Sequence, residues 1–222
     1  MVVLGLTGSI GMGKTTVANA LKNCGAAVYN ADAAVHRLLA PGGAAVGPVL
    51  ARFPDSASGE GAARAVDRGA LGAHVFADAD ALAELEAILH PLVRAGERRF
   101  LSASQRRGCR LAVLDVPLLF ETGGETRCDA TLVVSAPPFV QRARVLGRAR
   151  MSEERLAAIL ARQMPDAEKR RRADFVIRTS LDRRVSRRAA QRVAARLSAT
   201  RGTRWPLCWS GALKPAGEGD HA

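Results

Sequence analysis

The residues with the clearest chemical meaning lie within the first 16 positions. Gly8-Ser9-Ile10-Gly11-Met12-Gly13-Lys14-Thr15 matches the pattern G-x-x-x-x-G-K-[ST] at every fixed position. Glycines let the backbone turn tightly and bring successive N–H groups onto anionic oxygens. The lysine of this pattern reaches the β- and γ-phosphates, and the hydroxyl after it binds Mg²⁺. We therefore predict an ATP site formed by Gly8, Gly11, Met12, Gly13, Lys14, Thr15 and Thr16, with Lys14 catalytic and Thr15 a magnesium ligand.

A carboxylate, Asp32, follows the second strand that the sequence predicts. In open α/β sheets the ligand crevice lies beyond the carboxyl ends of the strands, so Asp32 shares a rim with the phosphate loop. A carboxylate there can accept the proton of an attacking hydroxyl and orient it toward the γ-phosphorus. The alternative is that Asp32 only caps a helix beginning at Ala33. Spacing alone leaves both interpretations open.

A second acid, Asp115, ends the apolar run of the third predicted strand, and Glu121 follows near the same rim. An acid at the Asp115 position can hold Mg²⁺ through water in NTPases with this loop. We predict Asp115 as a magnesium-binding residue, the alternative being a solvated carboxylate at a strand end.

The stretch Phe139–Arg150 is arginine-rich and helical in pattern. Gln141, Arg144 and Arg148 share one helix face, where arginines can stabilise the charge of a transferring phosphoryl group. We predict Arg144 and Arg148 as catalytic residues and a small lid at about residues 147–154. A solvated basic face is the alternative.

Strand-like and helix-like segments alternate along the chain, which predicts an α/β fold with a parallel sheet covered by helices on both faces. The predicted strands are Val2–Leu6, Ala26–Tyr29, Arg110–Val116, Ala130–Ser135 and Phe175–Ile177. The predicted helices include Thr15–Asn23, Ala79–Leu89, Phe139–Leu146, Glu153–Arg162, Asp166–Arg172 and Arg183–Leu197. The domains expected are a P-loop nucleotide-binding core (1–32 and 106–200), a helical acceptor-binding insertion without a convincing strand (33–105), and a loose tail (201–222).

Composition excludes several classes of protein. The 222 residues are 48% apolar, which excludes wholesale disorder, and no apolar run approaches the ~20 residues of a membrane helix. The cysteines and histidines are too scattered for a zinc site. The net charge of +12 comes from 29 arginines and 4 lysines spread along the chain with few aromatics between them, so we expect no nucleic-acid partner. A cytoplasmic location is expected, and the oligomeric state is not constrained.

Taken together, these motifs resemble the dephospho-coenzyme A kinase family. The resemblance rests on GLTGSIGMGKTT, the Ala31-Asp32 pair, Leu89–Val93 (LHPLV), Pro117–Glu121 (PLLFE), the Gln141/Arg144/Arg148 pattern, Gln163 and Arg172–Ile177 (RADFVI). It implies phosphoryl transfer from ATP to the ribose 3′-hydroxyl of dephospho-CoA, the last step of CoA synthesis. It also implies that Asp32 is the catalytic acid.

The chain departs from this family pattern at two places. Asn30 stands where the family often has an aspartate, and Arg178-Thr179 stands where it often has Asp-Asn. Two other functions compete with the resemblance. One is a P-loop kinase for another small acceptor, such as a nucleoside monophosphate or shikimate, and the other is a nucleotide-dependent switch or a basic RNA-associated NTPase. The long 33–105 insertion disfavours a shikimate-type acceptor, and the absence of an NKxD motif disfavours a GTPase switch.

Overall fold

A five-stranded parallel sheet forms the centre of the computed structural model, which describes residues 1–75, 78–149, 151–179 and 182–209. Its strands lie in the order β2-β5-β1-β6-β7, and every neighbouring pair is parallel. They are β1 (Val2–Thr7), β2 (Ala27–Asn30), β5 (Leu111–Asp115), β6 (Ala130–Ser135) and β7 (Phe175–Arg178). Every residue of β1, β5 and β6 is buried, as expected for strands covered on both faces. The predicted α/β class is confirmed.

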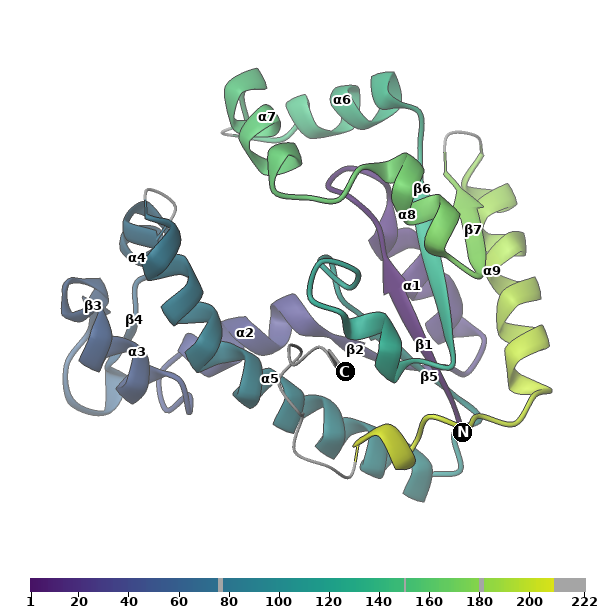
Figure 1. Cartoon of the computed structure of the whole chain (residues 1–222), viewed down its shortest axis with the longest axis horizontal. Helices are drawn as coiled ribbons and strands as arrows, with labels where there is room; N and C mark the ends of the chain where they lie inside the picture. The colour runs from purple at the N-terminus through teal and green to yellow at the C-terminus, as the bar shows by residue number, and fades with distance from the viewer. Residues whose placement is uncertain (76–77, 150, 180–181, 210–222) are drawn as a thin grey trace, which may run out of the picture.

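The two faces of the sheet are buried by different helices (Figure 1). Leu4 and Leu6 of β1 point to one face, in a cluster with α1 (Lys14–Asn23) and α9 (Arg183–Ser198). Val3 points to the other face and clusters with Leu101 of the long helix α5 (Ala79–Arg106). This alternation follows from the two-residue period of a strand.

The segment between β2 and β5 builds a largely helical unit with its own hydrophobic cluster. It contains α2 (Ala31–Leu39), α3 (Val46–Arg52), η1 (Pro54–Ser56), η2 (Gly61–Ala63), α4 (Arg68–Val75) and the first half of α5. Our expectation that it has no strand is wrong in one detail, because β3 (Ala57–Ser58) and β4 (Ala65–Val66) pair antiparallel. Strands of two residues are too short to produce a recognisable alternation in the sequence. In Figure 1, α5 runs from this unit to the central sheet.

The helices after β6 begin with α6 (Pro138–Leu146) and α7 (Glu153–Ala161), which Figure 1 shows at the top of the molecule. The predicted lid spans the connection between them, of which residue 150 lies outside the described part. Helix α8 (Asp166–Arg172) then leads to β7, and η3 (Gly124–Arg127) lies earlier, between β5 and β6. No helix in the described ranges is long and apolar enough to cross a membrane.

The end of the chain is packed, so our expectation of a loose tail is wrong for residues 203–209. The carboxylate of Asp129 accepts hydrogen bonds from the backbone N–H groups of Thr203 (2.6 Å) and Arg204 (2.9 Å). Trp209, in η4 (Leu207–Trp209), is only 6% exposed, and its indole N–H donates to the carbonyl of Arg127 at 3.1 Å. Trp205 donates to the side chain of Gln105 at the end of α5. Residues 210–222 of the predicted tail lie outside the described residues.

Candidate active site

The predicted phosphate loop connects β1 to the first turn of α1, at the carboxyl end of the sheet. Gly8 has a φ of 155°, and a Cβ there would lie 2.5 Å from the carbonyl oxygen of Val134. Gly13 occupies the N-cap position of α1 with a φ of 87°, and no side chain caps this end of the helix. The N–H groups of the first turn are therefore directed at the loop, where an anion would satisfy them. Thr15 and Thr16, in the first turn of this helix, are exposed.

Two glutamines from outside the loop hold its tip. Gln141 of α6 donates from Nε2 to the carbonyl oxygen of Ile10 at 2.8 Å. Gln163, after α7, accepts from the N–H of the same residue at 3.2 Å. Met12 is also held, since its Sδ accepts from the N–H of Ala136 at 3.0 Å. The shape of the loop is thus held by side chains of Gln141 and Gln163, from α6 and from the segment after α7.

Lys14 is paired with Asp115, which is 3% exposed. The register of the sheet explains this pair, because Asp115 lies beside Leu6 of β1 on one side and Asn30 of β2 on the other. The amide of Asn30 donates to the second carboxylate oxygen, Oδ2, at 2.8 Å. Both oxygens of Asp115 therefore have a partner, and the structure brings together two of the predicted site residues.

The donor set at this place suits a magnesium ion. The exposed Thr15 hydroxyl and the Asp115 carboxylate are both hard oxygen ligands, and they flank the lysine of the phosphate loop. Oδ1 of Asp115 is paired with Lys14, so it could face a magnesium ion only after the Lys14 side chain had turned toward a phosphate. The predicted magnesium residues thus fit the ion, with this rearrangement as a condition.

The structure separates the two interpretations of Asp32. Helix α2 begins at Ala31, and its cap is Asn30, whose Oδ1 accepts from the N–H of Ala33 at 2.7 Å. Asp32 lies inside the first turn of α2, exposed, and its carboxylate has no polar partner within the described ranges. The capping interpretation of Asp32 is therefore wrong, and its carboxylate is available to a ligand.

Of the two predicted arginines, only Arg144 contacts the loop. Its Nη1 donates to the carbonyl oxygen of Gly11 at 3.4 Å and to the hydroxyl of Thr179 at 3.0 Å. Its Nη2 donates to the carbonyl oxygen of Thr179. Arg148 is exposed, and among the described residues its side chain has no hydrogen-bond or ion-pair partner. The contact of Thr179 with the loop was not predicted from the sequence.

Glu121 supports the site instead of lining it. Its Oε1 pairs with Lys169 at 2.8 Å and accepts from the N–H of Met164 at 2.8 Å, and the Lys169 side chain is fully buried. This pair fixes α8 against the segment after β5. Lys169 was not predicted from the sequence, although lysine is rare in this chain and, among the described lysines, the other one paired with a carboxylate is Lys14. The scarcity of lysine is the sequence feature that could have indicated Lys169 as a structurally important residue.

A family model and curated relatives indicate one family for this chain. The family model described as CoaE: Dephospho-CoA kinase matches residues 2–183. A dephospho-CoA kinase of Paramagnetospirillum magneticum is 59% identical over 77% of this chain and 78% of its own length. One from Mesorhizobium japonicum is 51% identical over 91% of this chain and 100% of its own. The crystal structure of TT1252 from Thermus thermophilus superimposes with a TM-score of 0.74 at 37% identity, covering 88% of this chain and 97% of that one.

Proposed function

Since this chain belongs to the dephospho-CoA kinase family, we propose that it transfers the γ-phosphoryl group of ATP to the ribose 3′-hydroxyl of dephospho-CoA. The products are CoA and ADP. The observation that carries the proposal is the position of Asp32, which is exposed, has no partner in the described structure, and follows Asn30 of the Asn30–Asp115–Lys14 chain of contacts by two residues. A phosphate-binding loop and a free carboxylate thus lie at the same edge of the sheet, after β1 and β2, with the end of β5 between them.

ATP would place its phosphates against the N–H groups at the start of α1. Lys14 would then leave Asp115 and bring its charge to the β- and γ-oxygens, where negative charge rearranges during transfer. Arg144, which is hydrogen-bonded to the loop, would add a second positive charge. A magnesium ion, held by Thr15 and through water by Asp115, would supply neutralisation of the phosphate charge.

Asp32 would act on the acceptor hydroxyl. Phosphoryl transfer has a loose transition state, so the proton leaves late and the alignment of the attacking oxygen matters as much as its basicity. A carboxylate that no other group of the described chain engages can accept that proton and fix the direction of attack. Arg148, exposed after α6, would join the site only when the connection at about residues 147–154 moves as a lid.

The helical insertion, residues 33–105, would hold the acceptor. It begins directly after Asp32, and its part up to the first half of α5 has a hydrophobic cluster of its own, so this part can move relative to the sheet. Closure over the loop would exclude water and suppress hydrolysis of ATP. Hydrogen exchange with and without dephospho-CoA tests this: protection should increase in α2 to α5, and unchanged exchange there contradicts the assignment.

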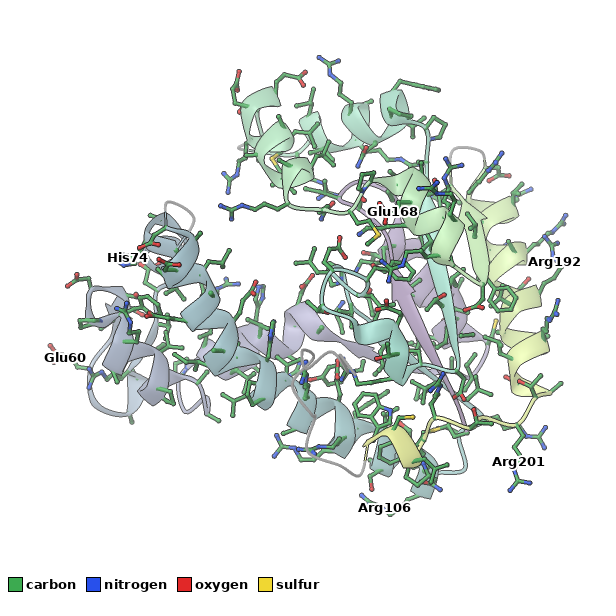
Figure 2. All side chains as sticks on the ribbon, in the orientation of Figure 1. Glu60, His74, Arg106, Glu168, Arg192 and Arg201 are labelled. Atoms are coloured by element: carbon green, nitrogen blue, oxygen red, sulfur yellow. The ribbon has the colours of Figure 1, made fainter. Side chains whose placement is uncertain are left out.

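The positive charge of the chain fits small polyanionic substrates. Arginines such as Arg192 and Arg201 point into solvent along the α9 side of the molecule (Figure 2). Such a field raises the encounter rate with ATP and dephospho-CoA. We infer that the protein acts in the cytoplasm on these molecules, with neither nucleic acid nor membrane as a partner. A tight, strongly salt-dependent affinity for RNA would contradict this inference.

The direct test is an acceptor panel. The protein is incubated with Mg-ATP and dephospho-CoA, nucleoside monophosphates or shikimate, and ADP formation is followed. We expect ADP to form rapidly only with dephospho-CoA. Mass spectrometry and ³¹P NMR of the product should then show a new 3′-phosphomonoester. Faster phosphorylation of another acceptor would favour the alternative kinase, and turnover independent of any acceptor would contradict the proposal.

A further inference from the structure

Thr179 connects three parts of the site although it lies far from them in the sequence. It follows β7, is 6% exposed, and its N–H donates to the carbonyl oxygen of Ser135 at 2.9 Å. Its hydroxyl donates to the carbonyl oxygen of Met12 in the phosphate loop at 2.6 Å. The same hydroxyl and the Thr179 carbonyl accept from the two terminal nitrogens of Arg144.

The hydrogen-bond capacity of Arg144 shows what this arrangement leaves free. A guanidinium carries five N–H donors in one rigid plane. Three are engaged: two from Nη1, to Gly11 and Thr179, and one from Nη2, to Thr179. With respect to the described residues, two donors therefore remain, which is the number that a bidentate contact with a phosphate uses. The contacts with Thr179 fix the plane in which those two donors lie.

The limited space between Gly13 and Thr179 restricts which side chain at position 179 can contact both the loop and Arg144. A Cβ added to Gly13 would lie 3.1 Å from the Thr179 hydroxyl and 3.5 Å from Nη1 of Arg144. The loop, the hydroxyl and the guanidinium are thus in close contact at one point. A short side chain that both donates and accepts is needed there, and a hydroxyl provides both functions.

We propose that Thr179 is a positioning residue that joins the phosphate loop to Arg144, so that the loop and the guanidinium meet the γ-phosphate as one preformed unit. The proposal rests on the proposed role of Arg144 in phosphoryl transfer. It also gives a role to Thr179 in the Arg178-Thr179 pair, where the chain departs from the family pattern.

The experiment compares Thr179→Val, which keeps the shape and removes the hydroxyl, with Thr179→Ser, which keeps the hydroxyl. Each is made with Arg144 intact and with Arg144→Ala, and Thr179→Ala replaces the valine variant if that protein does not fold. The first readout is the ratio of the ADP and ATP dissociation constants, which isolates the γ-phosphate and needs no acceptor. The second is kcat with dephospho-CoA.

With Arg144 intact, we expect Thr179→Val to lower both the ratio and kcat about tenfold, the effect of losing one hydrogen bond to a charged group. Thr179→Ser should stay within about threefold of the parent protein. With Arg144→Ala, removal of the Thr179 hydroxyl should change either readout less than about twofold, because the group it positions is gone.

Two results would overturn the proposal: an equal effect of Thr179→Val in both backgrounds, or equal effects of the valine and serine variants. Failure of the proposed function gives a different pattern. In that case the parent protein does not turn over dephospho-CoA, while the nucleotide-binding ratio still reports whether Thr179 acts through Arg144.

Discussion

Replacing Asn30 by aspartate is a sharp test of how the site is held together. Asn30 performs two tasks: its Oδ1 caps α2 and its Nδ2 donates to Oδ2 of Asp115. Asn30→Asp preserves the cap, because both residue types cap well. It exchanges the donor for a second anionic oxygen beside a carboxylate that is 3% exposed and has one cation, Lys14, as its ion-pair partner in the described structure.

The size of the effect follows from the distances. Two like charges about 4 Å apart repel by about 4 kcal/mol at the effective dielectric constant of about 20 near a protein surface. Attraction of Lys14 to the new carboxylate would offset about half of this, leaving about 2 kcal/mol less stability near pH 8. For a protein of this size, that lowers Tm by about 4–8 °C.

The pH dependence distinguishes this mechanism from a lost hydrogen bond. Repulsion raises the folded-state pKa of one carboxyl of the pair above its unfolded value of about 3.9. Stability from the protonated form is present at low pH and lost as the pH rises through the folded pKa. The Tm deficit of Asn30→Asp relative to the parent should therefore be large at pH 8, smaller at pH 5, and reduced by added Mg²⁺.

Thermal unfolding of the parent, Asn30→Asp and Asn30→Ser measures this. The serine variant keeps a capping oxygen and adds no charge, so its deficit should be about 1 kcal/mol and should not depend on pH. An Asn30→Asp protein as stable as the parent at pH 8, or with the same deficit at both pH values, would refute the reasoning.

Three further predictions concern other contacts. Lys14→Met removes the charge that the β- and γ-oxygens need, so turnover should fall by two or more orders of magnitude; near-normal turnover of the folded variant would contradict the loop assignment. Trp209→Ala empties a site that is 6% exposed and should lower the unfolding free energy in urea by about 3 kcal/mol, whereas an unchanged value would mean that the tail is not packed. Burial raises the pKa of Asp129, but hydrogen bonds from Val3, Thr203 and Arg204 outweigh it and leave the pKa below its usual value. Asp129→Asn should therefore lose stability relative to the parent above about pH 4, a loss that shrinks as the pH falls below that value; a loss independent of pH would refute this.

The central sheet and the phosphate loop follow from local signals, and the sequence predicts both. An apolar β-branched run before a glycine-rich turn identifies β1 and the start of α1, and alternation of strands with helices identifies the parallel sheet. Asp115 is predicted beside the loop for the same reason, since it ends a strand whose neighbours in a parallel sheet end at the same edge.

Contacts between distant segments could not be predicted in this way. Thr179 has no periodicity or motif of its own. It lies against Met12 because β6 pairs with β1 on one side and with β7 on the other, which brings the segments after β1 and β7 together. The tail illustrates the same limit: prolines and polar residues around Trp205 and Trp209 are typical of a loose end, while the partners that hold them are distant in the chain. Helix α2 begins at Ala31, two residues earlier than the sequence predicts. The capping residue is therefore Asn30 and not Asp32.

The central claim is that Asp32 directs the acceptor hydroxyl at ATP held by the loop, and one variant tests it most directly. Asp32→Asn keeps the shape of the side chain and removes its charge, and no described contact depends on that charge. We predict that kcat with dephospho-CoA falls by roughly 10²-fold or more while the ATP dissociation constant and Tm stay unchanged. Retained turnover, or turnover lost together with ATP binding, would contradict the account.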